Sequence, residues 1–402
     1  MTSAEEQLPR RFGQFLLFDQ IGEGGMARIY LGKRSTELGG SRRVVVKQIL
    51  PMLSGSPEFS RLFIEEAKLS AQLTHGSIAQ VIDLGREEGQ LYIAMEYVEG
   101  FDLRELLKAC TKKQIPLPIE FTLWIVGETL RALDYAHRRR GDDGQKLNIV
   151  HRDVSPSNIL ISFEGEVKLC DFGIARAMGS GEEVPEEAIQ GKAGYMSPEA
   201  AAGEPLDARA DVFAAGIMLW ELLAGRRLYR VAKGAAPSLD QAARAEIPEL
   251  PARGYPNEAE LHAIVMRLLS RDREARYPTA QAALRDLEDY AAKASLLTSP
   301  LRFGEWLMEH FGAEILERRQ QREQRASELE REAATALEAP PESASGSALS
   351  ARVDSGIEPS PPSLQGMVRP SAPAPARRPG PALVVLVLAV IALVVFFALR
   401  GS

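Results

Sequence analysis

The chain has 402 residues, of which 45% are apolar and 26% are charged, so most of it is expected to be globular. The net charge of −7 argues against nucleic acid as the main partner. Two cysteines, Cys110 and Cys170, are too few for a disulfide framework and lack the nearby ligands of a metal site, which favours a reducing cytosolic compartment.

Residues 12–98 are predicted to form a small lobe rich in strands. Short apolar runs separated by Gly and charged turns predict strands within 13–25, 27–35, 42–50, 78–89 and 90–98. One helix is expected over 56–73, with Ser56 as its N-cap and Pro57 at its first position.

Residues 99–292 are predicted to form a larger, helical lobe. Val126, Leu130, Leu133 and His137 recur at helical spacing, and the segment 211–225 has the composition of a buried helix. A sheet lobe followed by a helical lobe makes the expected fold class α+β and bilobal.

Three further segments are expected after the second lobe. Residues 293–338 are predicted to be a helical extension whose first half packs on the domain and whose charged second half is solvated. Residues 339–380, rich in Pro, Ser and Ala, are predicted to be a disordered linker.

Residues 381–399 are predicted to be a transmembrane helix. The segment 382–399 contains 18 consecutive apolar residues, which at about 1.5 Å per residue nearly cross a bilayer core. A buried core helix is the alternative, but the run follows a linker with no domain to bury it. Arg369, Arg377 and Arg378 precede the run, so the positive-inside bias predicts a single-pass protein of the cell membrane whose N-terminal part is cytoplasmic.

The stretch "IGEGGMARIY" carries the first two glycines of a G-x-G-x-x-G pattern, Gly22 and Gly24, but has Ala27 in the third place. A dinucleotide site would need a helix next and an acid about 20 residues on. A β-branched and aromatic segment follows instead, which predicts a hairpin tip whose backbone N–H groups can approach phosphate oxygens.

Lys47 lies among apolar residues in "VVVKQI", and Glu66 follows 19 residues later on the predicted helix. A solvent-facing lysine on an edge strand is the alternative. A buried lysine needs an anionic partner, and a lysine held by a glutamate can grip ATP phosphates. Glu65 is the other candidate partner for Lys47, but on a helix its side chain points about 100° away from that of Glu66.

Four motifs carry a resemblance that covers residues 13–290. They are "GGMA" at 24–27, "HRDVSPSNIL" at 151–160, "DFGIARA" at 171–177 and "GYMSPEA" at 194–200. In order and spacing they resemble the eukaryotic-like serine/threonine protein kinases of bacteria. The resemblance implies a bilobal kinase fold, ATP with Mg²⁺ or alternatively Mn²⁺, and protein substrates with Ser or Thr hydroxyls.

The resemblance also implies roles for individual residues. Asp153 would orient the attacking hydroxyl or accept its proton, Asn158 and Asp171 would hold the metal, and His151 is expected to be structural. The residues expected around ATP are Ile21, Gly22, Glu23, Gly24, Gly25, Ile29, Lys47 and Glu66, with Met95, Glu96 and Val98 at the adenine. Glu199 and Arg276 are expected to form a buried pair, and Asp211 is expected to brace the catalytic loop.

Three departures from the family pattern stand out. The segment 138–148 is longer than usual and is expected to be a surface loop. Ser155 replaces a lysine and Lys192 replaces a threonine. One hypothesis is an exchange in which Lys192 brings its ammonium to Asp153 and the γ-phosphate while Ser155 supplies the hydroxyl. The alternative is a solvent-facing Lys192 and a slower reaction.

The segment 174–196 contains Ser180 as a candidate phosphorylation site and four glutamates. One interpretation is that a glutamate replaces the phosphate, and the alternative is a solvated acidic loop. The favoured function is a membrane-tethered serine/threonine protein kinase that autophosphorylates. The alternatives are a pseudokinase acting as an ATP-binding scaffold and a small-molecule kinase. The oligomeric state and the physiological substrate are left open.

Overall fold

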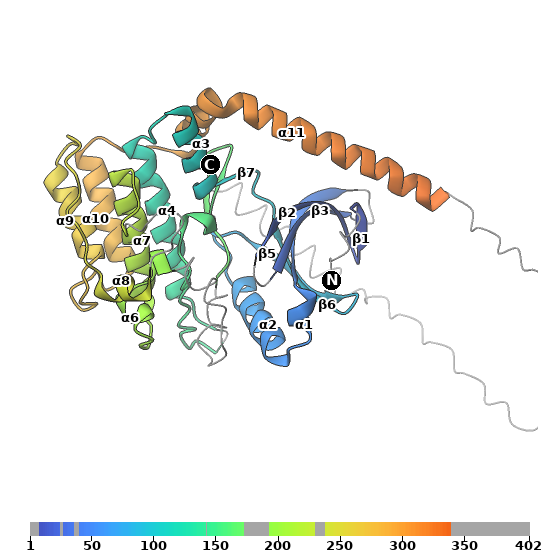
Figure 1. Cartoon of the computed structure of the whole chain (residues 1–402), viewed down its shortest axis with the longest axis horizontal. Helices are drawn as coiled ribbons and strands as arrows, with labels where there is room; N and C mark the ends of the chain where they lie inside the picture. Colours follow the sequence, from blue (N-terminus) through green and yellow to red (C-terminus); the bar gives the residue numbers. More distant parts are fainter. Residues whose placement is uncertain are drawn as a thin grey trace, which may run out of the picture. The chain divides into compact units, whose positions relative to one another are not determined.

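The computed structural model of the chain describes residues 8–24, 27–35, 40–141, 143–172, 193–229 and 238–338. The predicted linker and the apolar run 382–399 lie outside these residues. Within them the chain forms a strand-rich lobe followed by a helical lobe (Figure 1), as the apolar patterns predicted.

The small lobe is built on a six-stranded antiparallel sheet with the order β1-β2-β3-β4-β6-β5. The apolar alternation that predicted five strands also fills the lobe's core, where Tyr30 and Tyr92 are buried with two phenylalanines of the first hairpin. The strands are β1 (Arg10–Phe12), β2 (Phe15–Glu23), β3 (Ala27–Ser35), β4 (Ser41–Ile49), β5 (Val81–Glu87) and β6 (Gln90–Glu96). The short β1 had no clear sequence pattern.

Two helices connect β4 to β5, α1 (Pro51–Ser54) and α2 (Pro57–Ala71). The Ser56 hydroxyl accepts a hydrogen bond from the Phe59 backbone N–H at 3.4 Å, and Pro57 occupies the first helical position. The predicted N-cap is therefore confirmed, because Ser56 satisfies one of the backbone donors that a helix start leaves unpaired.

The large lobe combines a three-stranded sheet, in the order β7-β8-β9, with helices packed on one core. Its first elements are β7 (Gly100–Asp102), α3 (Leu103–Lys113), α4 (Ile119–His137), η1 (Pro156–Asn158), β8 (Ile159–Ser162) and β9 (Val167–Leu169). After these come η3 (Ala193–Tyr195), α6 (Pro198–Ala201), α7 (Ala208–Ala224), α8 (Leu239–Arg244), α9 (Glu258–Leu268) and α10 (Ala280–Lys293).

Helices α4 and α7 form the centre of this lobe and carry the residues that support the site. Val126, Leu130 and Leu133 are fully buried, which confirms the predicted stripe on α4. Every residue of α7 from Ala210 to Trp220 is buried, as the largely apolar composition of this segment predicted. The long segment 138–148 is a surface loop in its described residues.

Helix α11 (Pro300–Glu338) follows α10 and runs from the helical lobe to the strands of the small lobe (Figure 1). Its first half is packed on the large lobe as predicted, since Phe303, Leu307, Phe311 and Ile315 are all buried. Residues 320, 321 and 323–325 are exposed, as a solvated second half predicts, but the arginines within 318–325 also contact both lobes. A charged composition predicts exposure, but it does not predict which partners of opposite charge lie within reach.

In the described part of the chain, no helix combines the length and the apolar character needed to cross a membrane. The predicted span at 381–399 falls outside that part.

Candidate active site

The predicted phosphate loop is the turn of the β2–β3 hairpin. Gly22 pairs with Ile29 across the two antiparallel strands, and the Gly24 N–H donates to the Ala27 carbonyl at 2.9 Å. Ile21 and Glu23 complete the end of β2, and Gly25 lies outside the described residues. No helix follows the glycines, so a hairpin tip was the correct prediction.

Lys47 lies on β4, between Ile29 of β3 and Ile93 of β6, and is only 6% exposed. Its ammonium Nζ lies 3.0 Å from Oδ1 of Asp171, a residue 124 positions later. The alternative of a solvent-facing lysine is therefore wrong. The predicted partner Glu66 belongs to α2, but its side chain lies outside the described residues.

The connection between the lobes begins at the end of β6, with Met95 and Glu96. The Glu96 carboxylate accepts from Lys168 of β9 at 3.0 Å and from the Gln80 backbone N–H at 2.8 Å. These bonds hold the Glu96 side chain. They also fix the backbone between Glu96 and Val98, which the family resemblance identifies as the segment that would bond the adenine.

The Met95 side chain borders a small cavity next to the Cys170–Phe172 segment.

Asp211, on α7, fixes the backbone of the catalytic loop as predicted. Its Oδ2 accepts from the His151 N–H at 2.7 Å and from Nε2 of His137 at 2.8 Å, and its Oδ1 accepts from the Arg152 N–H at 2.8 Å. Burial is the strongest single influence and acts to raise the pKa of Asp211, but the hydrogen bonds and electrostatic interactions with His137 and His151 together outweigh it, so the pKa lies below its ordinary value. Asp211 is therefore a carboxylate at neutral pH.

The braced loop holds Arg152 at a φ of 68°, a conformation that costs a non-glycine residue of order 1–3 kcal/mol. His151 is fully buried against the ring of Phe172, with centroids 4.6 Å apart. Its Nδ1 accepts from the Asp153 N–H at 3.2 Å, and its Nε2 lies 2.9 Å from the Cys170 carbonyl oxygen. The bond to Nδ1 assigns the proton to Nε2, so His151 is a neutral positioning group.

Asn158 is fixed by its own amide. Its Nδ2 donates to the Asp153 carbonyl at 2.7 Å, and its backbone carbonyl accepts from Cys170 N–H at 3.0 Å. The donor nitrogen thus faces the loop, which leaves Oδ1 as the amide atom suited to a cation. Asp171 follows directly after Cys170 and has a φ of 60°. The backbone bond between Cys170 and Asn158 therefore holds the two candidate metal ligands, Asn158 and Asp171, on adjacent segments.

These residues fit a magnesium ion that binds together with ATP. No group of three or more His, Cys, Asp or Glu side chains in the described chain is arranged to hold a metal. Magnesium often takes only one or two protein oxygens and completes its shell with phosphate oxygens and water. Asn158 and Asp171 provide two such oxygens.

The two departures in the site are only partly described. The Ser155 hydroxyl lies 3.0 Å from the Ser157 hydroxyl. Lys192 and Ser180 lie outside the described residues, so the predicted exchange between Ser155 and Lys192 stays a prediction.

Glu199 and Arg276 form the buried pair that was predicted. Two hydrogen bonds of 2.6 and 2.8 Å join the guanidinium to the carboxylate, and the Arg276 side chain is 0% exposed. Burial acts to raise the pKa of Glu199, but its hydrogen bonds, above all those from Arg276, lower it below the ordinary 4.5. The pair joins α6 to the segment before α10, so it fixes the base of the large lobe.

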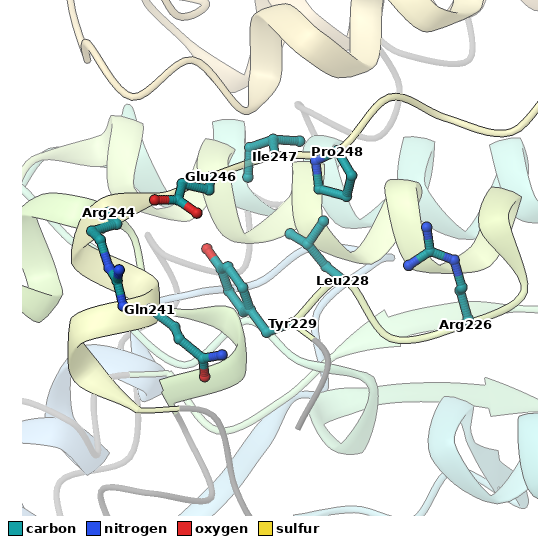
Figure 2. A pocket seen from close by; sticks show the side chains of 8 residues that line it. All are labelled: Arg226, Leu228, Tyr229, Gln241, Arg244, Glu246, Ile247 and Pro248. Atoms are coloured by element: carbon teal, nitrogen blue, oxygen red, sulfur yellow. The ribbon is translucent and has the colours of Figure 1, made fainter. Parts of the chain in front are cut away.

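A separate cavity of about 630 Å³ lies on the large lobe, between the loop after α7 and the segment around α8 (Figure 2). Arg226, Tyr229, Arg244 and Glu246 lie among its lining residues. Burial raises the pKa of Tyr229 to about 12. None of the predicted catalytic or ATP-binding residues is among the described residues that line it.

Two contributions to the site were missed in the sequence. Lys168 is separated from its partner Glu96 by 72 positions, and no local pattern connects them. The arginines of α11 contact the connection between the lobes, where Arg322 donates to the Tyr97 hydroxyl. Both contacts join residues that are far apart in the chain. The sequence shows only that one partner is charged, which does not identify the other partner.

Comparisons with known proteins agree with this geometry. The family model described as protein kinase domain matches residues 15–287. A tyrosine-protein kinase of Myxococcus xanthus, MasK, is 36% identical over 310 residues, covering 75% of this chain and 47% of its own length. A probable serine/threonine-protein kinase of Streptomyces coelicolor is 39% identical over 288 residues, covering 70% of this chain and 40% of its own length.

The serine/threonine-protein kinase PknB of Mycobacterium tuberculosis is 35% identical over 280 residues, 68% of this chain and 42% of its own length. The chain thus spans less than half the length of these curated relatives. Among solved structures, the PknI kinase domain of Mycobacterium tuberculosis is 28% identical with a TM-score of 0.53, covering 71% of this chain and 98% of that one. The expected bilobal kinase fold is confirmed.

Proposed function

The chain belongs to the protein kinase domain family, and from that premise we propose that it is an active serine/threonine protein kinase. It would transfer the γ-phosphoryl group of ATP to Ser or Thr hydroxyls of cytoplasmic proteins and of itself. One of the relatives is named as a tyrosine kinase, so the type of acceptor hydroxyl (Ser, Thr or Tyr) has to be measured.

The observation that supports this proposal is the convergence of Lys47, Asp153, Asn158 and Asp171. Residues from a strand of the small lobe and from two loops of the large lobe meet there, and Asp211 holds the central loop. Decayed kinases usually lose at least one such group, so the pseudokinase alternative is not favoured. The intact buried Glu199–Arg276 pair, which supports a peptide-docking surface, also speaks against a small-molecule kinase.

In the proposed reaction, Asp153 orients the substrate hydroxyl and takes its proton. The hydroxyl oxygen forms a bond to the γ-phosphorus while the bond to the β-phosphate oxygen breaks and ADP leaves. Lys47 offers a buried positive charge to the phosphates, and Asn158 and Asp171 would hold a magnesium ion. When bound, that ion would neutralise phosphate charge and orient the γ-phosphoryl group.

We retain the exchange of positive charge as part of the proposal. Lys192 would bring its ammonium to Asp153 and the γ-phosphate, and Ser155 would supply the hydroxyl. A positive charge near the transferred group stabilises the transition state wherever its side chain originates. The substitution Lys192→Ala is expected to lower turnover strongly, and near-normal turnover would show that the exchange is wrong.

We also propose that residues 12–98 and 99–292 are the kinase lobes, and that 339–380 is a linker to a membrane span at 381–399. The support is the run of 18 apolar residues at 382–399, with arginines before it, which favours a cytoplasmic kinase domain. Fractionation of cells expressing the chain, with and without 382–399, tests the anchor. Recovery of both forms in the soluble fraction would refute it.

The deciding experiment is incorporation of labelled phosphate from ATP with Mg²⁺, followed by phosphoamino acid analysis. Asp153→Asn should abolish incorporation. Asp143→Asn is the matched control, because Asp143 is exposed in the surface loop, where its carboxylate accepts from the Gln145 backbone N–H. Label on phosphoserine or phosphothreonine supports the proposal. ATP binding without any incorporation would favour the scaffold alternative, and phosphotyrosine alone would reassign the acceptor.

A further inference from the structure

Helix α11 is built into the large lobe at its N-terminal end. The rings of Phe303 and Phe121 stack with centroids 4.7 Å apart, and the Phe311 ring meets Phe101 edge-on at 6.0 Å. Lys113 donates to the His310 carbonyl at 2.7 Å. The helix is therefore anchored by aromatic packing and by hydrogen bonds.

Two glycines allow the backbones to approach closely at this anchor. A Cβ added to Gly165 would lie 2.0 Å from the Pro300 carbonyl oxygen, and one added to Gly304 would lie 2.8 Å from the Glu164 carbonyl carbon. Neither contact would accept a side chain without displacing backbone. The direction of α11 is thus fixed by direct backbone contact with the turn between β8 and β9.

Beyond the anchor, three arginines contact the chain that connects the lobes or the small lobe itself. Their positions, 319, 322 and 325, are three residues apart, which places them along one side of the helix. Arg319 lies 3.3 Å from the Glu99 carboxylate and 2.9 Å from that of Glu164. Arg322 donates to the Tyr97 hydroxyl, and its guanidinium lies 5.5 Å from the centre of the Tyr97 ring.

The last contacts reach the sheet that carries the ATP residues. Arg325 lies 3.2 Å from Asp19 of β2, and Glu323 lies 3.7 Å from Arg43 of β4. Asp19 precedes the phosphate loop by three residues, and Arg43 precedes Lys47 by four. One helix therefore contacts the three segments expected to hold ATP: β2, β4 and the connection after β6.

We propose that α11 is a strap that positions the ATP site, with Arg322 as its main positioning residue. This inference rests on the proposed function, because ATP is the ligand whose site is positioned. ATP would have to contact both lobes at the same time. Bonds that fix the position of one lobe relative to the other therefore favour the conformation that binds ATP. The strap lies outside the residues matched by the family model, which end at 287.

The contacts differ in strength. The Arg325 side chain is 63% exposed and its pair with Asp19 is screened by water, so that contact contributes little. Arg322 is half-buried, and it combines a charge-assisted hydrogen bond with stacking on Tyr97. Arg322 is the contact to remove.

The test uses the full chain and a fluorescent ATP analogue with Mg²⁺. Arg322→Ala should raise the dissociation constant by about 5-fold, the lower end of typical coupling between sites. Turnover at saturating ATP should change much less. Arg302→Ala is the matched control, because it removes an exposed arginine from the same helix near the anchor. It should leave the dissociation constant unchanged.

A second set of variants separates positioning from a general loss of folding. Tyr97→Phe removes the hydroxyl but keeps the ring, so its effect should be smaller than that of Arg322→Ala. The double variant should be no weaker than Arg322→Ala alone, because the two changes remove one shared contact. Arg322→Lys should restore part of the affinity. Strictly additive effects would overturn the proposal.

Hydrogen exchange provides a readout that does not depend on ATP. Arg322→Ala should speed exchange in 97–102 and in β2, while α4 exchanges as in the wild type. Unchanged exchange and an unchanged dissociation constant would overturn the strap. A wild type that binds no ATP would instead refute the proposed function, and the exchange experiment would still decide whether α11 holds the lobes.

Discussion

The substitution Asp211→Asn tests how the buried carboxylate supports the catalytic loop. Asp211 is 1% exposed and accepts three hydrogen bonds, two at Oδ2 and one at Oδ1. An amide of the same shape has only one acceptor oxygen. Its nitrogen is a donor, so it must face at least one donor that the carboxylate now satisfies.

The hydrogen bonds predict which way the amide turns. Placing the oxygen at the Oδ2 position keeps the bonds from His137 and His151, and it loses only the one from the Arg152 N–H. A lost hydrogen bond to a charged group together with an unsatisfied buried donor costs about 2–4 kcal/mol. That is a large part of the free energy of unfolding of a typical domain, which is about 5–15 kcal/mol.

The loss falls on Arg152, whose positive φ needs the brace, and Asp153 is the next residue. A displacement of about 1 Å at a reacting group can lower turnover roughly 100-fold. We therefore expect Asp211→Asn to lower kcat by about 10- to 100-fold, with a much smaller change in ATP affinity.

Urea unfolding followed by tryptophan fluorescence, together with single-turnover phosphorylation, measures both effects. Asp207→Asn is the matched control, because Asp207 caps the same helix through the Arg209 N–H and asparagine caps equally well. Wild-type kcat and an unchanged urea midpoint in Asp211→Asn would refute the argument that this carboxylate holds the loop.

Three other outcomes are expected. Glu199→Gln should lower the free energy of unfolding in urea by about 3–5 kcal/mol, because it leaves a buried guanidinium uncompensated. Folding lowers the pKa of Glu199, so the carboxylate contributes its full stabilisation above pH 4.5 and loses it as the pH falls further. The stability of the variant should therefore depend less on acid pH than that of the wild type. Gly165→Ala should loosen α11 and make it more sensitive to protease, since the new Cβ meets the Pro300 carbonyl at 2.0 Å; an unchanged cleavage pattern would contradict this. Burial raises the pKa of the Cys110 thiol to about 11 and raises that of Cys170, so alkylation at pH 8 should require urea, and rapid labelling of the folded chain would argue against the packing.

Much of the site follows from short segments of sequence. His151, Asp153 and Asn158 belong to one loop, and their roles depend on spacing within eight residues. Strand alternation and the Ser56 cap were also readable, because side chains two or three residues apart interact within one element. The resemblance to a known family supplied the expected long-range pairs, Glu199 with Arg276 and Asp211 with the loop backbone.

The amino-acid pattern alone predicted the two lobes, most of their elements and the residues proposed to carry phosphoryl transfer. It did not predict which distant charges meet, because that depends on the three-dimensional packing. Lys47 pairs with Asp171 across 124 positions, and Arg322 meets Tyr97 across 225. The physical reason is that an arginine on a helix surface has the same sequence pattern whether it faces water or a neighbour. Its partner is set by the direction of α11, which depends on the backbone contact of Gly165 and Gly304 with their neighbours.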